Sequence, residues 1–224
     1  METKSLSFLL IVVLWLCNTF LICSSSTAKQ QQQQQPDPVL DIDGKPLRTS
    51  GKYYILPVIR GRGGGLTLSS SDNLTCPLFV AQDPFEVNFG LPVIFSPAKP
   101  TKGGAVRVSS DQNIRFDAAT ICVQSTVWKL SYDDGLKQYF VVSGGVQGNP
   151  GPKTLDNWFK IEKFNREDGS DKKKSRREDY KLVFCPTVCN YCKVICRDVG
   201  IFIQNGTRRL ALSDVPFMVQ FKKA

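Results

Sequence analysis

Short runs of β-branched and aromatic residues, separated by clusters of glycine, proline, asparagine and aspartate, follow one another from residue 52 almost to the end of the chain. This pattern is typical of strands joined by tight turns, and no stretch repeats its apolar residues at helical spacing. The runs lie at residues 53–59, 66–68, 78–81, 93–95, 106–108, 114–116, 127–130, 139–142, 158–161, 180–184, 200–203, 210–212 and 217–221. The residues alone therefore predict an all-β domain of about a dozen strands, either a barrel or a sandwich.

The first 28 residues have the layout of a secretory signal peptide. The basic residue Lys4 lies near the start, an apolar block follows it, and small residues end the segment. A membrane anchor is the alternative, but the apolar block is barely long enough to span a bilayer and Asn18 interrupts it. We expect cleavage between Ser24 and Lys29.

The segment after the signal peptide, residues 29–37, contains a run of glutamines that cannot bury enough apolar surface to fold. We expect it to be a disordered stub. Residues 38–223 have the length of one domain with a full core. The net charge is +9, with or without residues 1–28. Charge alone indicates nonspecific attraction, and an exported protein does not meet genomes, so we expect no nucleic-acid partner.

Six of the eight cysteines remain once the signal peptide is removed. An even number of cysteines in an exported chain indicates disulfides, and six cysteines allow fifteen pairings. The spacing of the last four would also suit zinc or an iron–sulfur cluster, but thiolate ligation competes poorly in an oxidising compartment. We predict disulfides, no metal site and no cofactor. The six cysteines are Cys76, Cys122, Cys185, Cys189, Cys192 and Cys196.

The chain carries no histidine, which removes Ser-His-Asp and Cys-His triads. The adjacent carboxylates Asp133 and Asp134 precede a glycine and are typical of a solvated turn. The glycine-rich run at 61–65 lacks the spacing of a phosphate-binding loop, so we interpret it as a flexible connection between strands. We expect no enzymatic activity. Two sequons, at Asn73 and Asn205, predict N-glycosylation.

The stretch from residue 39 to residue 55 reads Val-Leu-Asp-Ile-Asp-Gly-Lys-Pro-Leu-Arg-Thr-Ser-Gly-Lys-Tyr-Tyr-Ile, which is a turn followed by a strand. The same run resembles the signature of the soybean-type Kunitz protease inhibitors of plants. Further motifs resemble the miraculin-like branch of that family and extend the likeness over nearly all of 38–223. The motifs lie at 63–69, 144–152, 158–162, 181–189 and 208–214.

The resemblance implies a β-trefoil of twelve strands in three pseudo-repeats, six strands forming a short barrel and six capping it. It also implies the disulfide pairs Cys76 with Cys122, Cys185 with Cys196, and Cys189 with Cys192. The domain is thus expected to be a single Kunitz-type trefoil with three disulfides.

The resemblance further implies a secreted plant inhibitor of serine endopeptidases, trypsin-like ones first. Such inhibitors present an exposed loop in a substrate-like conformation, which limits the entropy lost on binding. A trypsin-like pocket carries a buried carboxylate that pairs with lysine or arginine. By resemblance, the inhibitory loop here consists of Pro97, Ala98, Lys99, Pro100, Thr101, Lys102 and Gly103.

Two lysines are candidates for the residue that enters the protease. The family's specificity-determining arginine falls on Pro100 when residues are counted from Cys76 without gaps. Lys99 precedes that proline, which trypsin disfavours, while Lys102 precedes two flexible glycines. We favour Lys102. Thr49 stands where the family prototype has an asparagine that braces the loop, so the brace is expected to be weaker.

Two alternatives stay open: an inhibitor of cysteine proteases that acts through another loop, and a non-inhibitory defence, taste or storage protein of the miraculin-like branch. The acid-triggered taste effect of the branch's namesake is attributed to histidines, so it does not carry over. A glycan-binding trefoil is less favoured, because no carbohydrate-binding motif recurs in the three lobes.

The resemblance also bears on assembly and location. The namesake joins two chains through a cysteine shortly after its Trp-Phe-Lys-Ile-Glu motif, and Asn165 takes that place here. We therefore expect a monomer. Its partners are expected to be serine endopeptidases, or cysteine endopeptidases in the alternative. The mature form is not expected to contact a membrane. The expected location is the extracellular space, with the vacuole as the alternative.

Overall fold

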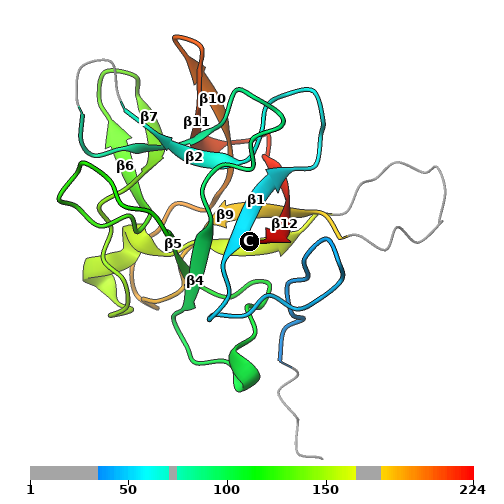
Figure 1. Ribbon diagram of the computed structural model, residues 1–224. Coiled ribbons are helices and arrows are strands. Elements are labelled where there is room, and N and C mark those ends of the chain that lie inside the picture. The colour runs from blue at the N-terminus through cyan, green and yellow to red at the C-terminus, as the bar shows by residue number, and fades with distance from the viewer. Residues whose placement is uncertain (1–34, 71–74, 165–177) are drawn as a thin grey trace, which may run out of the picture. The chain divides into compact units, whose positions relative to one another are not determined.

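Twelve strands and two short 3₁₀ helices make up the described part of the chain (Figure 1). The computed structural model describes residues 35–70, 75–164 and 178–224. The predicted signal peptide, most of the predicted stub, Asn73 and Asn165 lie outside these ranges. Pro36–Ala224 forms one compact unit. Within the described ranges, no helix has the length and apolarity needed to cross a bilayer.

The strands alternate with turns as the run pattern predicts, and the all-β prediction is confirmed. The prediction of a strand at residues 106–108 is wrong: Ala105 and Arg107 form only isolated bridges, to Arg48 and Pro38. Their partner is the irregular N-terminal segment, so no ladder develops. The elements are β1 (Tyr53–Pro57), β2 (Leu66–Ser69), β3 (Phe79–Gln82), β4 (Val93–Pro97), η1 (Lys102–Gly104), β5 (Gln112–Phe116), β6 (Lys129–Asp133), β7 (Gln138–Val142), η2 (Pro152–Asn157), β8 (Lys160–Lys163), β9 (Tyr180–Phe184), β10 (Arg197–Gln204), β11 (Thr207–Ser213) and β12 (Met218–Lys223).

Six strands close into a barrel. Antiparallel ladders join β1 to β12 and β4, β4 to β5, β8 to β9, and β9 to β12. The remaining gap, between β5 and β8, is closed by a single bridge in which Gln112 and Phe159 exchange both backbone hydrogen bonds, with N–O distances of 2.8 Å and 3.0 Å. The cylinder thus has no open edge for another chain to extend.

Three hairpins, β2–β3, β6–β7 and β10–β11, cap the barrel and appear at the top of Figure 1. One strand of each hairpin meets the other two: Phe79 pairs with Val142, Ala211 with Phe140, and Arg209 with Ala81. Each hairpin belongs to one run of four strands, namely β1–β4, β5–β8 and β9–β12. The fold is therefore a β-trefoil of three pseudo-repeats, as the resemblance implies.

The core follows from the period-two alternation of the barrel strands. In β1, β4 and β12 every second side chain points inward, which buries Tyr53, Phe95 and Phe221. The Phe95 and Phe221 rings meet edge to face, with centroids 5.7 Å apart. Burying one such side chain stabilises the fold by roughly 1.5–3 kcal/mol. The rest of the core is drawn from all three pseudo-repeats.

The N-terminal segment, which carries the family signature, closes a turn and fastens it to the barrel. The Asp41 carboxylate accepts the backbone N–H of Asp43 at 3.0 Å and of Lys45 at 2.8 Å. Leu47 is fully buried and its carbonyl accepts the N–H of Val106 at 2.9 Å. The signature residues thereby fix the chain that runs beside the β4–β5 connection.

Candidate inhibitory loop

The predicted inhibitory loop is the β4–β5 connection, which projects from the end of the barrel opposite the hairpin cap (Figure 1). Pro97 ends β4, and the next residues turn outward. Lys99 and Pro100, which we call the tip, are exposed, whereas Ala105 and Val106, where the chain returns, are buried. The loop therefore has an accessible tip on a fixed base.

Hydrogen bonds hold the loop on both sides of this tip. The N–H of Ala98 donates to the carbonyl of Asp111 at 2.9 Å. On the far side, the Thr101 hydroxyl donates to the carbonyl of Ala105 at 2.7 Å, and the N–H of Gly104 donates to the carbonyl of Thr101 at 3.0 Å. Only the residues between these anchors lack a backbone restraint.

The segment at residues 48–49 braces the end of the loop, in a way that sequence reasoning missed. The Arg48 guanidinium donates to the carbonyl of Gly103, and the N–H of Thr49 donates to the carbonyl of Gly104 at 2.9 Å. A backbone amide and a neighbouring cation thus brace this end of the loop. In the sequence, the basic residue Arg48 beside Thr49 was the feature that could have indicated this brace.

The two candidate lysines occupy different backbone conformations. Lys102 opens the 3₁₀ turn η1, and Gly103 after it is left-handed, with φ 71° and ψ 12°. A side chain is strained in that region, so glycine is required there. Thr101 is extended, with φ −104° and ψ 140°. The Lys99 side chain has no hydrogen-bond or ion-pair partner among the described residues.

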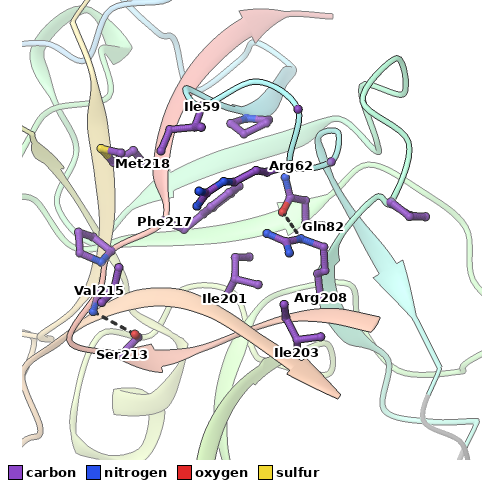
Figure 2. Close-up of a pocket in the computed structure, with 15 residues that line it drawn as sticks. Ile59, Arg62, Gln82, Ile201, Ile203, Arg208, Ser213, Val215, Phe217 and Met218 are labelled. Atoms are coloured by element: carbon purple, nitrogen blue, oxygen red, sulfur yellow. Dashed lines mark hydrogen bonds between the residues drawn. The ribbon is translucent and has the colours of Figure 1, made fainter. Parts of the chain in front are cut away.

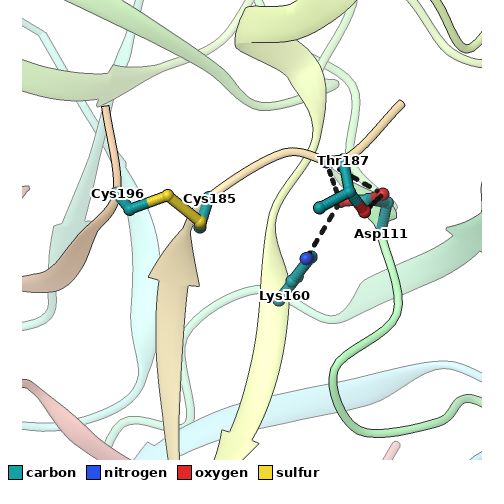
Figure 3. Close-up of a disulfide and its surroundings, with 5 residues drawn as sticks. All are labelled: Asp111, Lys160, Cys185, Thr187 and Cys196. Atoms are coloured by element: carbon teal, nitrogen blue, oxygen red, sulfur yellow. Dashed lines mark hydrogen bonds and ion pairs between the residues drawn. A yellow bond between two sulfur atoms is a disulfide. The ribbon is translucent and has the colours of Figure 1, made fainter. Parts of the chain in front are cut away.

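Asp111 links the loop to the disulfide-bonded segment after β9 (Figure 3). Its carbonyl holds Ala98, while its carboxylate accepts the Thr187 N–H at 3.1 Å and the Thr187 hydroxyl at 2.6 Å. Lys160 Nζ lies 4.0 Å from the same carboxylate, whose side chain is only 8% exposed. One residue therefore fixes two surface segments, and nothing in its sequence context indicated this role.

Three disulfides join the same pairs that the resemblance implies. Cys76 pairs with Cys122 with a Cα–Cα distance of 5.9 Å. Cys185 pairs with Cys196, and the ring so closed contains the smaller Cys189–Cys192 ring. Between these last two cysteines, Tyr191 is 79% exposed.

The other predicted features lie apart from the loop. Asp133 and Asp134 form the β6–β7 turn, where Asp133 accepts the N–H of Leu136 and Asp134 pairs with Lys137. Asn205 is exposed at the β10–β11 turn, with φ 47°. Among the residues that the structure describes, no group of histidine, cysteine, aspartate or glutamate side chains could hold a metal ion.

The chain as a whole matches a known family. Residues 39–223 fit the legume Kunitz family model, described as trypsin and protease inhibitor. The chain belongs to the Kunitz family of protease inhibitors. It is 56% identical over 189 residues to Kunitz trypsin inhibitor 5 of Arabidopsis thaliana, which covers 84% of this chain and 86% of that protein. It is 53% identical over 195 residues to miraculin of Synsepalum dulcificum, covering 84% of each chain.

A solved structure agrees with the sequence relatives. The Kunitz-type cysteine protease inhibitor PCPI-3 from potato superposes with a TM-score of 0.70 at 34% identity, covering 85% of this chain and 98% of that one. The resemblance to Kunitz inhibitors and to miraculin is thus confirmed. The Kunitz relatives named here differ in the protease class that their names state, so the family alone does not choose a target.

Proposed function

We propose that this Kunitz protein, acting as a monomer, inhibits a trypsin-like serine endopeptidase through the loop at residues 97–103, and that Lys99 enters the specificity pocket. One observation carries the proposal: Lys99 is exposed, has no partner among the residues that the structure describes, and lies in a loop that is hydrogen-bonded on both sides of it. A loop held in this way loses little conformational entropy when it binds.

Lys99 is chosen over Lys102, which the sequence favours, on conformational grounds. A protease cleft binds its ligand as an extended strand, and the bond after Lys102 enters a left-handed turn. The residue after Lys99 is Pro100, whose ring fixes φ and stiffens the tip.

The decisive experiment is a titration of the mature protein against trypsin, chymotrypsin and papain. We expect tight inhibition of trypsin that is lost in Lys99→Ala and retained in Lys102→Ala. Lys137→Ala is the matched control, because Lys137 is an exposed lysine in the hairpin cap, away from the loop. If Lys99→Ala inhibits trypsin as well as the unmodified protein does, Lys99 is not the specificity residue. If no serine protease is inhibited, the serine-protease proposal fails.

A second candidate, inhibition of a papain-like cysteine protease, is supported by the double disulfide ring at 185–196 and by the likeness to the potato inhibitor. Tyr191 protrudes from that ring as an exposed aromatic anchor. Papain inhibition that survives Lys99→Ala and is lost in Tyr191→Ala would support this candidate. Inhibition of none of the three proteases would favour a non-inhibitory defence or storage role.

We further propose that residues 1–28 direct the chain out of the cytosol and are removed. Three disulfides support this proposal, because such bonds persist in oxidising compartments. A fluorescent protein fused after residue 224 should accumulate in the extracellular space or the vacuole. Deletion of 1–28 should leave it in the cytosol, and an unchanged distribution would contradict the proposal.

A further inference from the structure

A cavity of about 680 Å³ opens among the loops of the cap, and none of its described lining residues belongs to the inhibitory loop (Figure 2). The β1–β2 connection, the end of β3, the β10–β11 hairpin and the start of β12 line it. The volume falls within the range of small-molecule sites, which is about 300–1,000 Å³. It can therefore hold a small ligand without blocking the inhibitory loop.

The walls of this cavity are mainly apolar. They include Ile59, Ile201, Ile203, Val215 and Phe217. Ile203 is 61% exposed and Val215 is 75% exposed, and both belong to segments held by strand pairing or turn hydrogen bonds. These apolar side chains are exposed to water around the cavity. A ligand that covers them would gain roughly 25 cal/mol of binding free energy for each Å² of apolar surface removed from water.

Two arginines bring positive charge into this apolar hollow. Arg208 Nε donates to Gln82 Oε1 at 2.8 Å, and Gln82 Nε2 donates to the carbonyl of Gly64 at 3.1 Å. Gln82 is only 3% exposed, so this buried amide fixes the Arg208 guanidinium in the orientation that Figure 2 shows. Arg62 is exposed and has no hydrogen-bond or ion-pair partner among the described residues.

The charge of these arginines is not balanced inside the cavity. None of the fifteen residues drawn in Figure 2 is an aspartate or a glutamate. Of the two carboxylates next to the lining residues, Asp214 pairs with Arg197 at 2.7 Å, whereas Asp83 accepts the N–H of Phe85 at 2.8 Å and keeps its charge. The lining of the cavity therefore combines apolar walls with two arginines and no acidic residue.

We propose that this cavity binds a small amphipathic organic anion, with an apolar body against Ile201 and Phe217 and a carboxylate or sulfonate at Arg62 and Arg208. Guanidinium groups bind such oxoanions with charge-assisted hydrogen bonds. Gly61 and Gly63 of the glycine-rich run at 61–65 line this cavity. A Cβ on Gly63, which has φ 107°, would lie 2.7 Å from the carbonyl oxygen of Asp83.

Fluorescence titration of the mature protein with 8-anilinonaphthalene-1-sulfonate tests the proposal. We expect saturable binding at one site, displaced by dodecanoate but not by acetate or dodecyltrimethylammonium at the same concentration. Arg62→Gln should weaken probe affinity about tenfold, as expected for one charge-assisted contact. Arg60→Gln is the matched control, because Arg60 is an exposed arginine two residues away that does not line the cavity.

Equal probe affinity in Arg62→Gln and the unmodified protein would overturn the proposal, as would displacement by the cationic amphiphile as readily as by dodecanoate. Thermal unfolding midpoints of both variants establish that the fold is intact. Lys99→Ala should bind the probe with unchanged affinity. Failure of the protease proposal and failure of this one are therefore separate results.

Discussion

At the scale of single residues, the inhibitory loop depends on side chains that lie outside it. Arg48 and Thr49 hold two consecutive carbonyls, those of Gly103 and Gly104, from a segment more than fifty residues earlier in the chain. Arg48 is exposed and contributes no core packing. We therefore expect Arg48 to make the loop more rigid and so to raise the affinity for a protease. We expect it to have little effect on the stability of the fold.

The first prediction concerns this brace. Arg48→Ala removes a charged donor from the Gly103 carbonyl, and we expect trypsin inhibition to weaken by about tenfold, since a hydrogen bond to a charged group contributes roughly 1.5–3 kcal/mol. The inhibition constant and the unfolding midpoint should be measured together. Arg48→Lys should recover part of the affinity. A variant that loses stability but keeps its affinity would contradict the assignment.

A second residue-scale feature is the buried hydroxyl of Tyr180. It accepts the N–H of Leu40 at 2.9 Å and donates to Glu178 at 2.8 Å. Burial, with Glu178 adding to it, raises the pKa of the Tyr180 phenol above its ordinary value of 10.0. Above pH 10 the unfolded chain loses this proton while the folded chain keeps it, so the free energy of unfolding falls as pH rises.

The second prediction follows from this decrease in the free energy of unfolding with rising pH. Tyr180→Phe should lower the free energy of unfolding at pH 7 by about 1–3 kcal/mol, because the partly buried Leu40 N–H loses its acceptor. The variant should also lose less stability than the unmodified protein between pH 9 and pH 11, since the phenol no longer titrates. Urea unfolding across this range measures both effects. Parallel pH profiles would rule out the role given to Tyr180.

At the scale of elements, the disulfides differ in the length of chain that they close. Cys76 and Cys122 are 46 residues apart in sequence, whereas Cys189 and Cys192 are 3 apart. In the chain-entropy model the longer ring restricts the unfolded chain more and stabilises the fold by about 4 kcal/mol, against about 2 kcal/mol for the shorter one.

The third prediction ranks these bridges. The double variant Cys76→Ser/Cys122→Ser should lower the free energy of unfolding about twice as much as Cys189→Ser/Cys192→Ser. Chemical denaturation of both variants under oxidising conditions gives the comparison. Equal losses would indicate that native-state contacts, and not the unfolded chain, determine the effect.

The strands of this fold could be predicted from the sequence, but the contacts between distant segments could not. Alternation and turn residues predicted the strands well, because each barrel strand buries every second side chain. The strand prediction at 106–108 was wrong, because the backbone of this run hydrogen-bonds to the irregular N-terminal segment and not to a strand. Roles such as those of Arg48 and Asp111 depend on contacts across 55 and 76 residues, which no local pattern records. The cavity could not be predicted for the same reason, because four segments that are separate in the sequence line it.

At the scale of the whole molecule, the barrel depends on its last strand. β12 pairs with β1 over five residues and also with β9, so it joins the first pseudo-repeat to the third. Without it, two barrel strands would lose a partner and the core around Phe221 would open. The trefoil is therefore a single cooperative unit despite its three similar parts.

The fourth prediction tests this dependence. Deletion of residues 218–224 should abolish cooperative unfolding, because the barrel cannot close. Deletion of Ala224 alone, which removes one hydrogen bond to Lys52, is the control and should leave the transition nearly unchanged. Thermal scans followed by circular dichroism distinguish the two. A cooperative transition in the shorter chain would mean that the first eleven strands fold by themselves.

Because β1 pairs with β12, the barrel cannot close until β12 has been translated. β1 leaves the ribosome long before its partner β12, which lies far later in the chain. At about 5–20 residues per second, the interval is on the order of ten seconds or more. During that time β1 can pair with β4, but the edge that pairs with β12 has no partner strand and is exposed to pairing with another chain.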